Sequence, residues 1–268
     1  MSLNKILETE ILKSVENGIQ NKTDFIAVEQ PLEIRLAHYI NDLKTLVITM
    51  CSPDDIEDLI YGFLFTENII NCANDIIEIS TFDNELGLIA EVILDHTIDF
   101  EKFLNKRQGM VHASCGVCGK TEFDELLTFK YPKILKSDNK ISSEIIQSLP
   151  GKLNQHQQAF TKTGGIHASA LFDLNGELII VREDIGRHNA LDKLIGAALQ
   201  LDLLPLSENI VLLSGRISFE LVHKSLMAGV TVLAAIGAPS SLSVEVAKVN
   251  NLQLIGFTKP ESYNIYGK

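Results

Sequence analysis

The stretch IVLLSGRISFELVHKSLMAGVTVLAAIGAPSS, residues 210–241, decides the fold. It contains two short apolar runs, Ile210–Leu213 and Val230–Ile236, separated by a helix-like segment over Phe219–Ala228. Gly229 follows that segment directly and is typical of a helix end. Uninterrupted apolar strands joined by helical crossovers indicate a mostly parallel sheet that is buried on both faces.

The sequence on either side extends this pattern. Asn175-Gly176 lies between two apolar runs and predicts a two-residue hairpin. A helix over Ser243–Asn250 and a strand over Leu252–Phe257 come after the stretch. An intervening helix is predicted from five apolar residues at helical spacing, which are Leu191, Leu194, Ile195, Ala198 and Leu199. We therefore expect residues 121–268 to form one α/β domain.

Residues 1–110 are expected to form a smaller α+β domain. Residues 1–20 predict a loose amphipathic helix, because Ile11, Leu12 and Val15 sit at helical spacing. Ser52-Pro53-Asp54-Asp55 predicts a helix start, with Ser52 as the N-cap and Pro53 as the first helical residue. Strands are predicted over Phe25–Val28, Leu32–Leu36, Leu46–Thr49, Ile76–Ser80 and Leu88–Leu94.

Composition narrows the class of protein. Lys and Arg total 23 against 35 Asp and Glu, so the net charge of -12 argues against nucleic-acid or anionic-membrane binding. No apolar run is long enough to span a bilayer, and the first 20 residues lack the apolar core of a secretory signal. Four cysteines in 268 residues do not suggest a disulfide framework. We expect a cytoplasmic protein in which Cys51 and Cys72 are buried.

Cys115-Gly116-Val117-Cys118 is the motif most informative about chemistry. Flanking glycines loosen the backbone, so we expect residues 111–120 to be a mobile, reactive loop. Only the thiolate form of such a cysteine is nucleophilic. The pair is compatible with sulfur relay, with a redox dithiol, and with part of a zinc site completed by His112. Spacing alone leaves these three open, and we assign no metal.

Polar residues follow three of the predicted strands. In open α/β sheets ligands bind outside the carboxyl ends of the strands, and helix N-termini there favour anions. The alternative is that such residues only make turns and helix caps. The candidates for holding a phosphate-bearing ligand are Ser214, Gly215, Arg216, Ser240, Ser241, Thr258 and Lys259.

Two further runs are candidates for the same ligand. Gly164, Gly165 and His167 could line an anion with backbone N–H groups, although the glycines alone favour a plain turn before the hairpin. Arg182 and Arg187 could clamp a diphosphate, with His188 orienting it. The alternative for the run over residues 182–189 is an internal salt-bridge network with Asp184 or Asn189 as a helix cap.

Taken together, these segments resemble one family, the formate dehydrogenase accessory sulfurtransferases of the FdhD type. The resemblance extends from about Gln30 to Tyr266. The stretches that carry it are Pro31–Ile34, Ser52–Asp58, Gly62–Glu67, Ser114–Gly119, Thr163–Ala168, Arg182–Lys193, Ser214–Glu220, Ala238–Leu242, Gly256–Phe257 and Asn264–Tyr266.

The resemblance implies what the residues alone do not name. Such proteins accept a persulfide from a cysteine desulfurase and deliver the sulfur to the molybdenum or tungsten of a bis-molybdopterin guanine dinucleotide cofactor required by formate dehydrogenase. It implies Cys115 as persulfide carrier and Cys118 as its partner. It also implies a three-layer α/β C-terminal domain similar to cytidine deaminases, a homodimer, and no permanently bound metal.

The family's guanine dinucleotide segment corresponds here to Phe257, Thr258, Lys259, Pro260, Glu261 and Ser262. Lys259 stands where the family often has arginine; lysine keeps the charge but loses the bidentate fork. A second hypothesis is a non-enzymatic chaperone that binds the cofactor and delivers it to formate dehydrogenase, with incidental cysteines.

Overall fold

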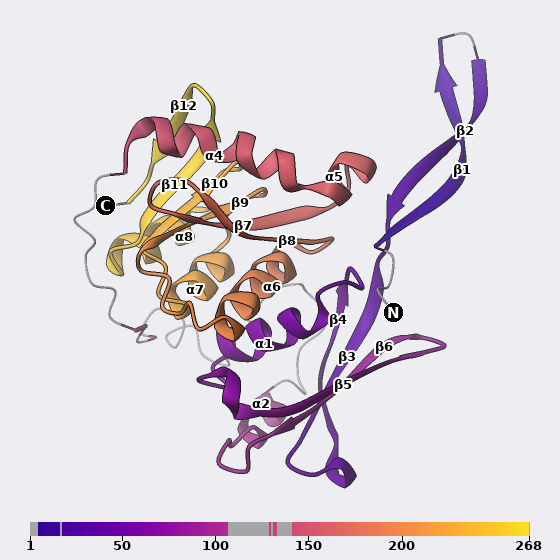
Figure 1. Cartoon of the computed structure of the whole chain (residues 1–268), viewed down its shortest axis with the longest axis vertical. Helices are drawn as coiled ribbons and strands as arrows, with labels where there is room; N and C mark the ends of the chain where they lie inside the picture. Colours follow the sequence, from indigo (N-terminus) through magenta and orange to yellow (C-terminus); the bar gives the residue numbers. More distant parts are fainter. Residues whose placement is uncertain (1–4, 17, 107–128, 130, 133–140, 268) are drawn as a thin grey trace.

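A computed structural model describes residues 5–16, 18–106, 129, 131–132 and 141–267. It contains a two-stranded, a four-stranded and a six-stranded sheet, together with helices that cover the two larger sheets (Figure 1). The expected α/β fold is confirmed. The described part of the chain holds no helix with the length and apolar character needed to cross a membrane.

The six-stranded sheet has the order β12-β11-β10-β9-β7-β8. Its strands are β7 (His167–Asp173), β8 (Leu178–Asp184), β9 (Asn209–Leu213), β10 (Val232–Ala235), β11 (Gln253–Lys259) and β12 (Ser262–Ile265). Parallel pairing is confined to β9–β10 and β10–β11, and the other three strand pairs are antiparallel, so the sheet is mixed and the expectation of a mostly parallel sheet is wrong. The hairpins β7–β8 and β11–β12 flank this parallel centre with antiparallel pairs.

Helices cover both faces of this sheet. They are α4 (Ser143–His156) and α5 (Gln158–Thr163) before β7, and α6 (Arg187–Gln200), α7 (Phe219–Met227) and α8 (Ser241–Val249) after β8. Leu149 of α4 packs with Phe172 and Leu212 on one face. On the other face α6, α7 and α8 pack against Leu171 and Val211. The sheet is therefore the middle of three layers (Figure 1).

The four-stranded sheet lies in the N-terminal part of the chain and has the order β4-β3-β6-β5. Its strands are β3 (Gln30–Ala37), β4 (Lys44–Cys51), β5 (Ile76–Asn84) and β6 (Gly87–Leu94), accompanied by α1 (Ile56–Thr66), α2 (Glu101–Lys106) and the short turns η1 (Ile40–Asp42) and η2 (Ala73–Asp75). Leu59, Ile60 and Leu64 of α1 pack against the alternate residues Leu32 and Ile34 of β3.

Helix α1 also joins the two halves of the molecule. It lies against α6, and glycines meet at the crossing: a Cβ on Gly62 would overlap the Asp192 carbonyl oxygen, and one on Gly196 would overlap the Asp58 carbonyl oxygen. The two helix backbones therefore touch directly, which fixes the N-terminal sheet relative to the three-layer part.

The predicted start of α1 is wrong. The helix begins at Ile56, after Asp55 in a left-handed conformation (φ 49°). Ser52 is buried instead: its N–H donates to Asp184 Oδ2 at 3.0 Å, and its hydroxyl accepts from the Ile185 N–H at 3.1 Å. A long-range contact has replaced the local cap that the sequence predicted.

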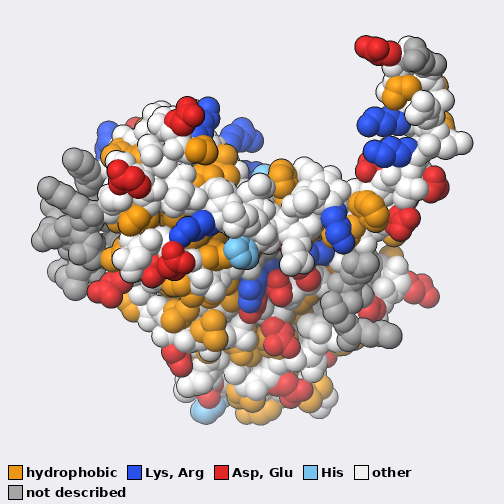
Figure 2. Space-filling view, turned by 45° about the horizontal axis from the view of Figure 1, so that its top comes forward, with side chains coloured by type: hydrophobic (Ala, Val, Ile, Leu, Met, Phe, Trp, Pro, Cys, Tyr) orange, Lys and Arg blue, Asp and Glu red, His pale blue; other side chains and the backbone are white. Residues whose placement is uncertain are grey.

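The predicted helix over residues 1–20 is also wrong. Strands β1 (Ile6–Val15) and β2 (Gly18–Ala27) form a ten-pair antiparallel hairpin, called the arm here. It projects away from both larger sheets (Figure 1), and it carries both charged and apolar side chains (Figure 2). The apolar spacing near Ile11 fits a helix, but pairing with the next ten residues satisfies the backbone of both segments as a ribbon.

Candidate functional site

One edge of the six-stranded sheet gathers most of the predicted binding residues. The three parallel strands end at this edge, and so does β8, because His167 at the start of β7 pairs with Asp184 at the end of β8. The predicted residues at or just beyond this edge are Gly164, Gly165, His167, Arg187, His188, Ser214, Gly215, Arg216, Ser240, Ser241, Phe257, Thr258, Lys259, Pro260, Glu261 and Ser262.

Backbone hydrogen bonds tie the loops of this edge together. The Gly237 N–H donates to the Gly215 carbonyl at 3.1 Å, and the Phe257 N–H donates to the Gly237 carbonyl at 3.1 Å. A Cβ on Gly237 would lie 2.6 Å from the Gly215 oxygen, so only glycine allows this approach. The loops after β9, β10 and β11 therefore form one continuous rim.

Positive and ionisable side chains meet at the rim around Gly215. A Cβ on Gly215 would lie 3.2 Å from His167 Nδ1 and 3.8 Å from Arg187 Cδ. Burial lowers the pKa of His167, and the nearby Arg187, His188 and Arg216 lower it further. The imidazole is therefore neutral near pH 7 in the absence of a ligand.

Arg187 carries an unused donor at this place. Its Nε is buried and has no hydrogen-bond partner within the described part of the chain. Buried donors are normally satisfied, so an unpaired guanidinium N–H beside His167 fits an anionic ligand. Arg216 is exposed next to Gly215 and adds a second guanidinium to the rim.

His188 is held by an acidic partner. Its Nε2 lies 2.8 Å from Glu220 Oε2 and 3.2 Å from Ser218 Oγ. His188 and Glu220 are each only 8% exposed, so the contact connects the first turns of α6 and α7 inside the protein. This partner was not predicted, because no local pattern links positions 188 and 220.

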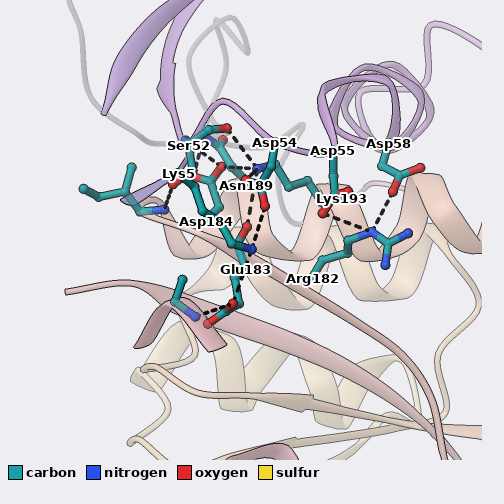
Figure 3. Close-up of polar contacts among 12 residues, drawn as sticks. Lys5, Ser52, Asp54, Asp55, Asp58, Arg182, Glu183, Asp184, Asn189 and Lys193 are labelled. Carbon is teal, nitrogen blue, oxygen red and sulfur yellow. Dashed lines mark hydrogen bonds and ion pairs between the residues drawn. The ribbon is translucent and has the colours of Figure 1, made fainter. Parts of the chain in front are cut away.

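Arg182 does not face the other candidate binding residues of the rim. Its Nε lies 2.6 Å from Asp58 Oδ2 and 3.6 Å from Asp55 Oδ2, both in the N-terminal part of the chain (Figure 3). The guanidinium is therefore occupied by carboxylates at the junction between the two halves. A phosphate-clamping role for this arginine stays a prediction without geometric support.

Several rim residues make the turns and caps that the sequence also allowed. Gly164 ends α5 with φ 65°, and Gly165 N–H donates to Thr163 Oγ1 at 3.3 Å. Ser240 is the N-cap of α8, its hydroxyl accepting from the Ser243 N–H at 3.2 Å. Ser214 is likewise engaged, because its hydroxyl accepts from the Ala168 N–H at 2.8 Å.

Phe257 stands out on the rim by its backbone. It has φ 53°, a region unfavourable for a bulky residue, and its side chain is 42% exposed. Thr258 beside it is buried, and its hydroxyl has no hydrogen-bond partner in the described residues. Lys259, Pro260, Glu261 and Ser262 form the exposed tip of the β11–β12 hairpin.

The run over residues 182–189 forms an internal network, as the second interpretation expected (Figure 3), but the N-cap of α6 is Gly186 and not Asp184 or Asn189. Asp184 accepts from the Gly186 N–H at 2.8 Å and from Asn189 Nδ2 at 3.2 Å. Lys193 Nζ lies 2.7 Å from Asp184 Oδ2 and 3.2 Å from Asp54 Oδ1. Lys193 was missed because a lysine on a helix usually indicates a solvated surface, whereas here it is fully buried.

A second chain of contacts connects the network to the arm. Lys5 Nζ lies 2.6 Å from Asp54 Oδ2 and 3.3 Å from Glu183 Oε2. The Glu183 carboxylate also accepts from the N–H groups of Ala159 and Phe160 at 3.0 Å each, at the start of α5. Helix α5 leads directly to Gly164 and the rim.

The two motif cysteines, Cys115 and Cys118, lie outside the described residues, as do His112 and the whole of residues 111–120. Phe129 and Tyr131 are described, and both side chains contact His223 of α7. Tyr131 Oη is 2.8 Å from His223 Nδ1, and the Phe129 and His223 ring centroids are 5.1 Å apart. Phe129 and Tyr131 are thus anchored on the helix that starts at the rim.

The other two cysteines differ from each other. Cys51 is buried, and burial raises the pKa of its thiol to about 12, which makes it a poor nucleophile. Cys72 is exposed, so the expectation that both are buried is wrong for this residue. Its thiol lies 3.4 Å from Asp75 Oδ1 in the turn η2. Within the described part of the chain, no group of three or more His, Cys, Asp or Glu side chains could hold a metal ion.

A model of the FdhD/NarQ family matches residues 27–268. The chain belongs to the FdhD/NarQ family. It is 39% identical to the sulfur carrier protein FdhD of Sulfolobus acidocaldarius, covering 98% of this chain and 96% of the relative. It is also 39% identical to the protein of the same name from Streptomyces coelicolor, covering 96% and 92%.

A solved structure shares the fold of this FdhD/NarQ chain. It is described as a formate dehydrogenase accessory protein from Desulfotalea psychrophila, and it superposes with a TM-score of 0.75 at 24% identity. The match covers 99% of this chain and 98% of the other. The three-layer part and the N-terminal sheet are therefore features of one shared architecture.

Proposed function

We propose that this protein is a sulfur carrier that supports formate dehydrogenase. It accepts sulfur as a persulfide on Cys115 from a cysteine desulfurase, and it hands the sulfur to the metal of a bis-molybdopterin guanine dinucleotide cofactor, whose GDP-like moieties the rim holds. Membership of a family whose relatives are named sulfur carriers supports the first part. The unpaired Arg187 donor beside His167 is the observation that carries the second.

The charge distribution of the rim fits an anionic ligand. The chain carries a net charge of -12, so a polyanion needs localised donors. The rim offers Arg187, Arg216 and Lys259, together with the N-terminal ends of α7 and α8. Phe257 offers an exposed aromatic face on which a guanine base can stack.

The two cysteines divide the chemistry between them. The Cys115 thiolate attacks the outer sulfur of the desulfurase persulfide; a new S–S bond forms, and the desulfurase cysteine leaves as a thiolate. The Cys118 thiolate then attacks the Cys115 sulfur, so that the outer sulfur leaves as sulfide with the electron pair of the broken bond. The resulting Cys115–Cys118 disulfide is returned to the dithiol by a thiol reductant.

Intact-mass spectrometry tests the carrier role. Incubation with a cysteine desulfurase and cysteine adds the mass of one sulfur atom to the wild type, and the adduct disappears with dithiothreitol. The variant Cys115→Ala/Cys118→Ala stays unmodified, whereas Cys72→Ala, which removes the exposed described thiol, is loaded like the wild type. An adduct that persists in the double variant would remove both residues from the role.

The rim is tested separately by calorimetry with GDP. Arg216→Ala weakens GDP binding about tenfold or more, because one charge-assisted hydrogen bond contributes about 1.5–3 kcal/mol. Arg182→Ala is the matched control, since that guanidinium is bound to Asp58, and it leaves GDP affinity within about twofold. Equal affinity of wild type and Arg216→Ala would place Arg216 outside the site.

A cofactor chaperone is the second candidate, and the same rim supports it. Complementation of a strain that lacks the protein separates the two functions. A Cys115→Ser/Cys118→Ser variant that restores full formate dehydrogenase activity supports the chaperone. Loss of activity in that variant, with GDP binding unchanged, supports the carrier.

A further inference from the structure

His167 and Arg187, which flank Gly215 on the rim, come from two separate parts of the chain. His167 ends the short loop that leads from α5 to β7, and Arg187 lies in the first turn of α6. A Cβ on Gly215 would nevertheless come within 3.2 Å of His167 Nδ1 and 3.8 Å of Arg187 Cδ. This place, called the anion site here, therefore depends on how the loop and the helix are held relative to each other.

Glu183 holds the loop that ends at His167. Its carboxylate accepts hydrogen bonds from the Ala159 and Phe160 N–H groups at 3.0 Å each, and it thereby fixes the start of α5. Its backbone pairs with Ala168, the residue after His167, in the β7–β8 hairpin. Glu183 is only 3% exposed. A displacement of Glu183 would therefore shift the segment that carries His167 at both of its ends.

Asp54 is connected to the first turn of α6 by a series of contacts. Its Oδ1 lies 3.2 Å from Lys193 Nζ, which in turn lies 2.7 Å from Asp184 Oδ2. The other oxygen of Asp184 accepts from the Gly186 N–H at 2.8 Å, one residue before Arg187. Asp54 is thus linked to the helix turn that presents Arg187 to the anion site.

Lys5 joins these two carboxylates. Its Nζ lies 2.6 Å from Asp54 Oδ2 and 3.3 Å from Glu183 Oε2 (Figure 3). Among the described residues, Lys5 is the only ion-pair partner of Glu183. A buried carboxylate that loses its counter-charge is unfavourable. Loss of the Lys5 ammonium would therefore draw the Glu183 side chain toward solvent and release the start of α5.

We propose that Lys5 is a positioning residue of the anion site: by joining Asp54 and Glu183, it keeps the two parts of the site in the arrangement that binds the ligand. Lys5 lies at the root of the arm, because its carbonyl accepts from the Val28 N–H at 2.9 Å just beyond the last pair of the ribbon. This inference rests on the proposed function, in which the rim holds GDP-like moieties.

Calorimetry with GDP separates positioning from simple attraction between charges. Lys5→Met removes a positive charge, and Glu183→Gln removes a negative one. Attraction alone weakens GDP binding in the first variant and strengthens it in the second. Positioning weakens binding in both variants, by about three- to tenfold, because each loses the ion pair between Lys5 and Glu183. Lys5→Arg keeps the charge and stays within about twofold of the wild type.

Hydrogen exchange measures the positioning without any ligand. The N–H groups at the start of α5 lose their acceptor when Glu183 moves, so residues 158–167 exchange faster in Lys5→Met than in the wild type. Lys22→Met is the matched control, because it removes an exposed lysine of the arm itself. It leaves both the exchange and the GDP affinity unchanged. Thermal unfolding verifies that each variant keeps its fold.

The outcomes distinguish this inference from the proposed function. If Lys5→Met binds GDP as the wild type does, if Glu183→Gln binds it equally well or better, or if exchange of residues 158–167 is unaltered in Lys5→Met, the positioning role is overturned while the rim keeps its ligand. A wild type that does not bind GDP overturns the proposed ligand of the rim, and the positioning role with it.

Discussion

The Lys193 ammonium lies 2.7 Å from the Asp184 carboxylate, and both side chains are completely buried where α6 meets the N-terminal part of the chain. Burial opposes the charge of Lys193, but Asp184 and Asp54 outweigh it and raise its pKa, so the ammonium stays charged. The pair orders the first turn of α6, from which Arg187 and His188 reach the rim, because Asp184 also binds the Gly186 N–H. Stability of the junction and geometry of the rim are thus linked.

Removing one member of this pair is expected to be costly. Lys193→Met leaves an uncompensated buried carboxylate and lowers the free energy of unfolding by about 3–5 kcal/mol. Asp184→Asn has a similar effect. The double variant Asp184→Asn/Lys193→Met loses less than the sum of the two, because no isolated charge remains buried. Urea denaturation measures all three, and strict additivity would show that the two groups do not interact.

The glycine crossing of α1 and α6 gives a second prediction. Gly62→Ala and Gly196→Ala each push a methyl group into a backbone carbonyl of the other helix, so each destabilises the protein by about 3 kcal/mol or more. Gly151→Ala in α4 is the matched control, because nothing lies within 4 Å of its Cβ position. That change raises stability by about 0.5–1 kcal/mol through helix propensity. Equal effects at the three positions would contradict the close crossing.

Binding of a diphosphate at the rim is expected to depend on pH through His167. Its pKa is lowered in the unliganded protein, mainly by burial, so the ring is neutral at pH 7. A bound phosphate favours the charged form and raises this pKa, so binding takes up a proton and tightens as pH falls from about 7.5 to 5.5. Calorimetry of GDP binding should show this slope in the wild type and a shallower one in His167→Gln. The variant corrects for titration of GDP itself, and parallel slopes would place His167 away from the ligand.

Phe257 is expected to lower the stability of the fold while it strengthens the binding of GDP. Its left-handed backbone costs a bulky residue about 1 kcal/mol or more, and asparagine tolerates this conformation well. Phe257→Asn therefore leaves stability equal or higher. It weakens GDP binding about tenfold, because a base–aromatic stack contributes about 1–3 kcal/mol. Phe160→Asn, a change at another exposed phenylalanine, leaves GDP binding unaltered. A variant that binds GDP normally would exclude stacking at this position.

The sequence predicted the elements whose signals are local. Apolar runs located β9, β10 and β11, and Asn175-Gly176 located the β7–β8 hairpin, because strand burial and turn geometry depend on neighbouring residues. The resemblance and the strand-end rule together placed most candidate ligands at one rim. The arm was missed because its apolar spacing fits a helix until residues 18–27 are available as a partner strand.

Other features depend on contacts that no local pattern encodes. The local sequence predicts Ser52 as a helix cap. In the structure its N–H instead donates to Asp184, which lies 132 positions away in the sequence. The sequence predicts Arg182 as a phosphate-binding residue. In the structure its guanidinium donates to Asp58 of α1. The roles of Lys193 and Glu220 could not be predicted, because charged residues on helices usually face solvent. Their partners, Asp184 and His188, are recognised only from the packing of α6 against other elements.

The anchor between Tyr131 and His223 gives the last prediction. The Tyr131 hydroxyl bonds to His223 Nδ1 at 2.8 Å, and the His223 ring stacks on Phe219 at the first turn of α7, directly after the rim. Tyr131 is thereby fixed on α7, near the proposed cofactor site. Tyr131→Phe removes only the hydroxyl and lowers stability by about 1 kcal/mol. We expect persulfide loading of Cys115 from the desulfurase to be unchanged, because that step needs only an accessible thiolate. Delivery of sulfur to formate dehydrogenase should fall several-fold, because a loosened anchor lowers the effective concentration of the persulfide at the rim. Mass spectrometry after loading and reconstituted formate dehydrogenase activity measure the two steps separately. If both fell together, the hydroxyl would be serving the fold as a whole and not the approach of the persulfide to the rim.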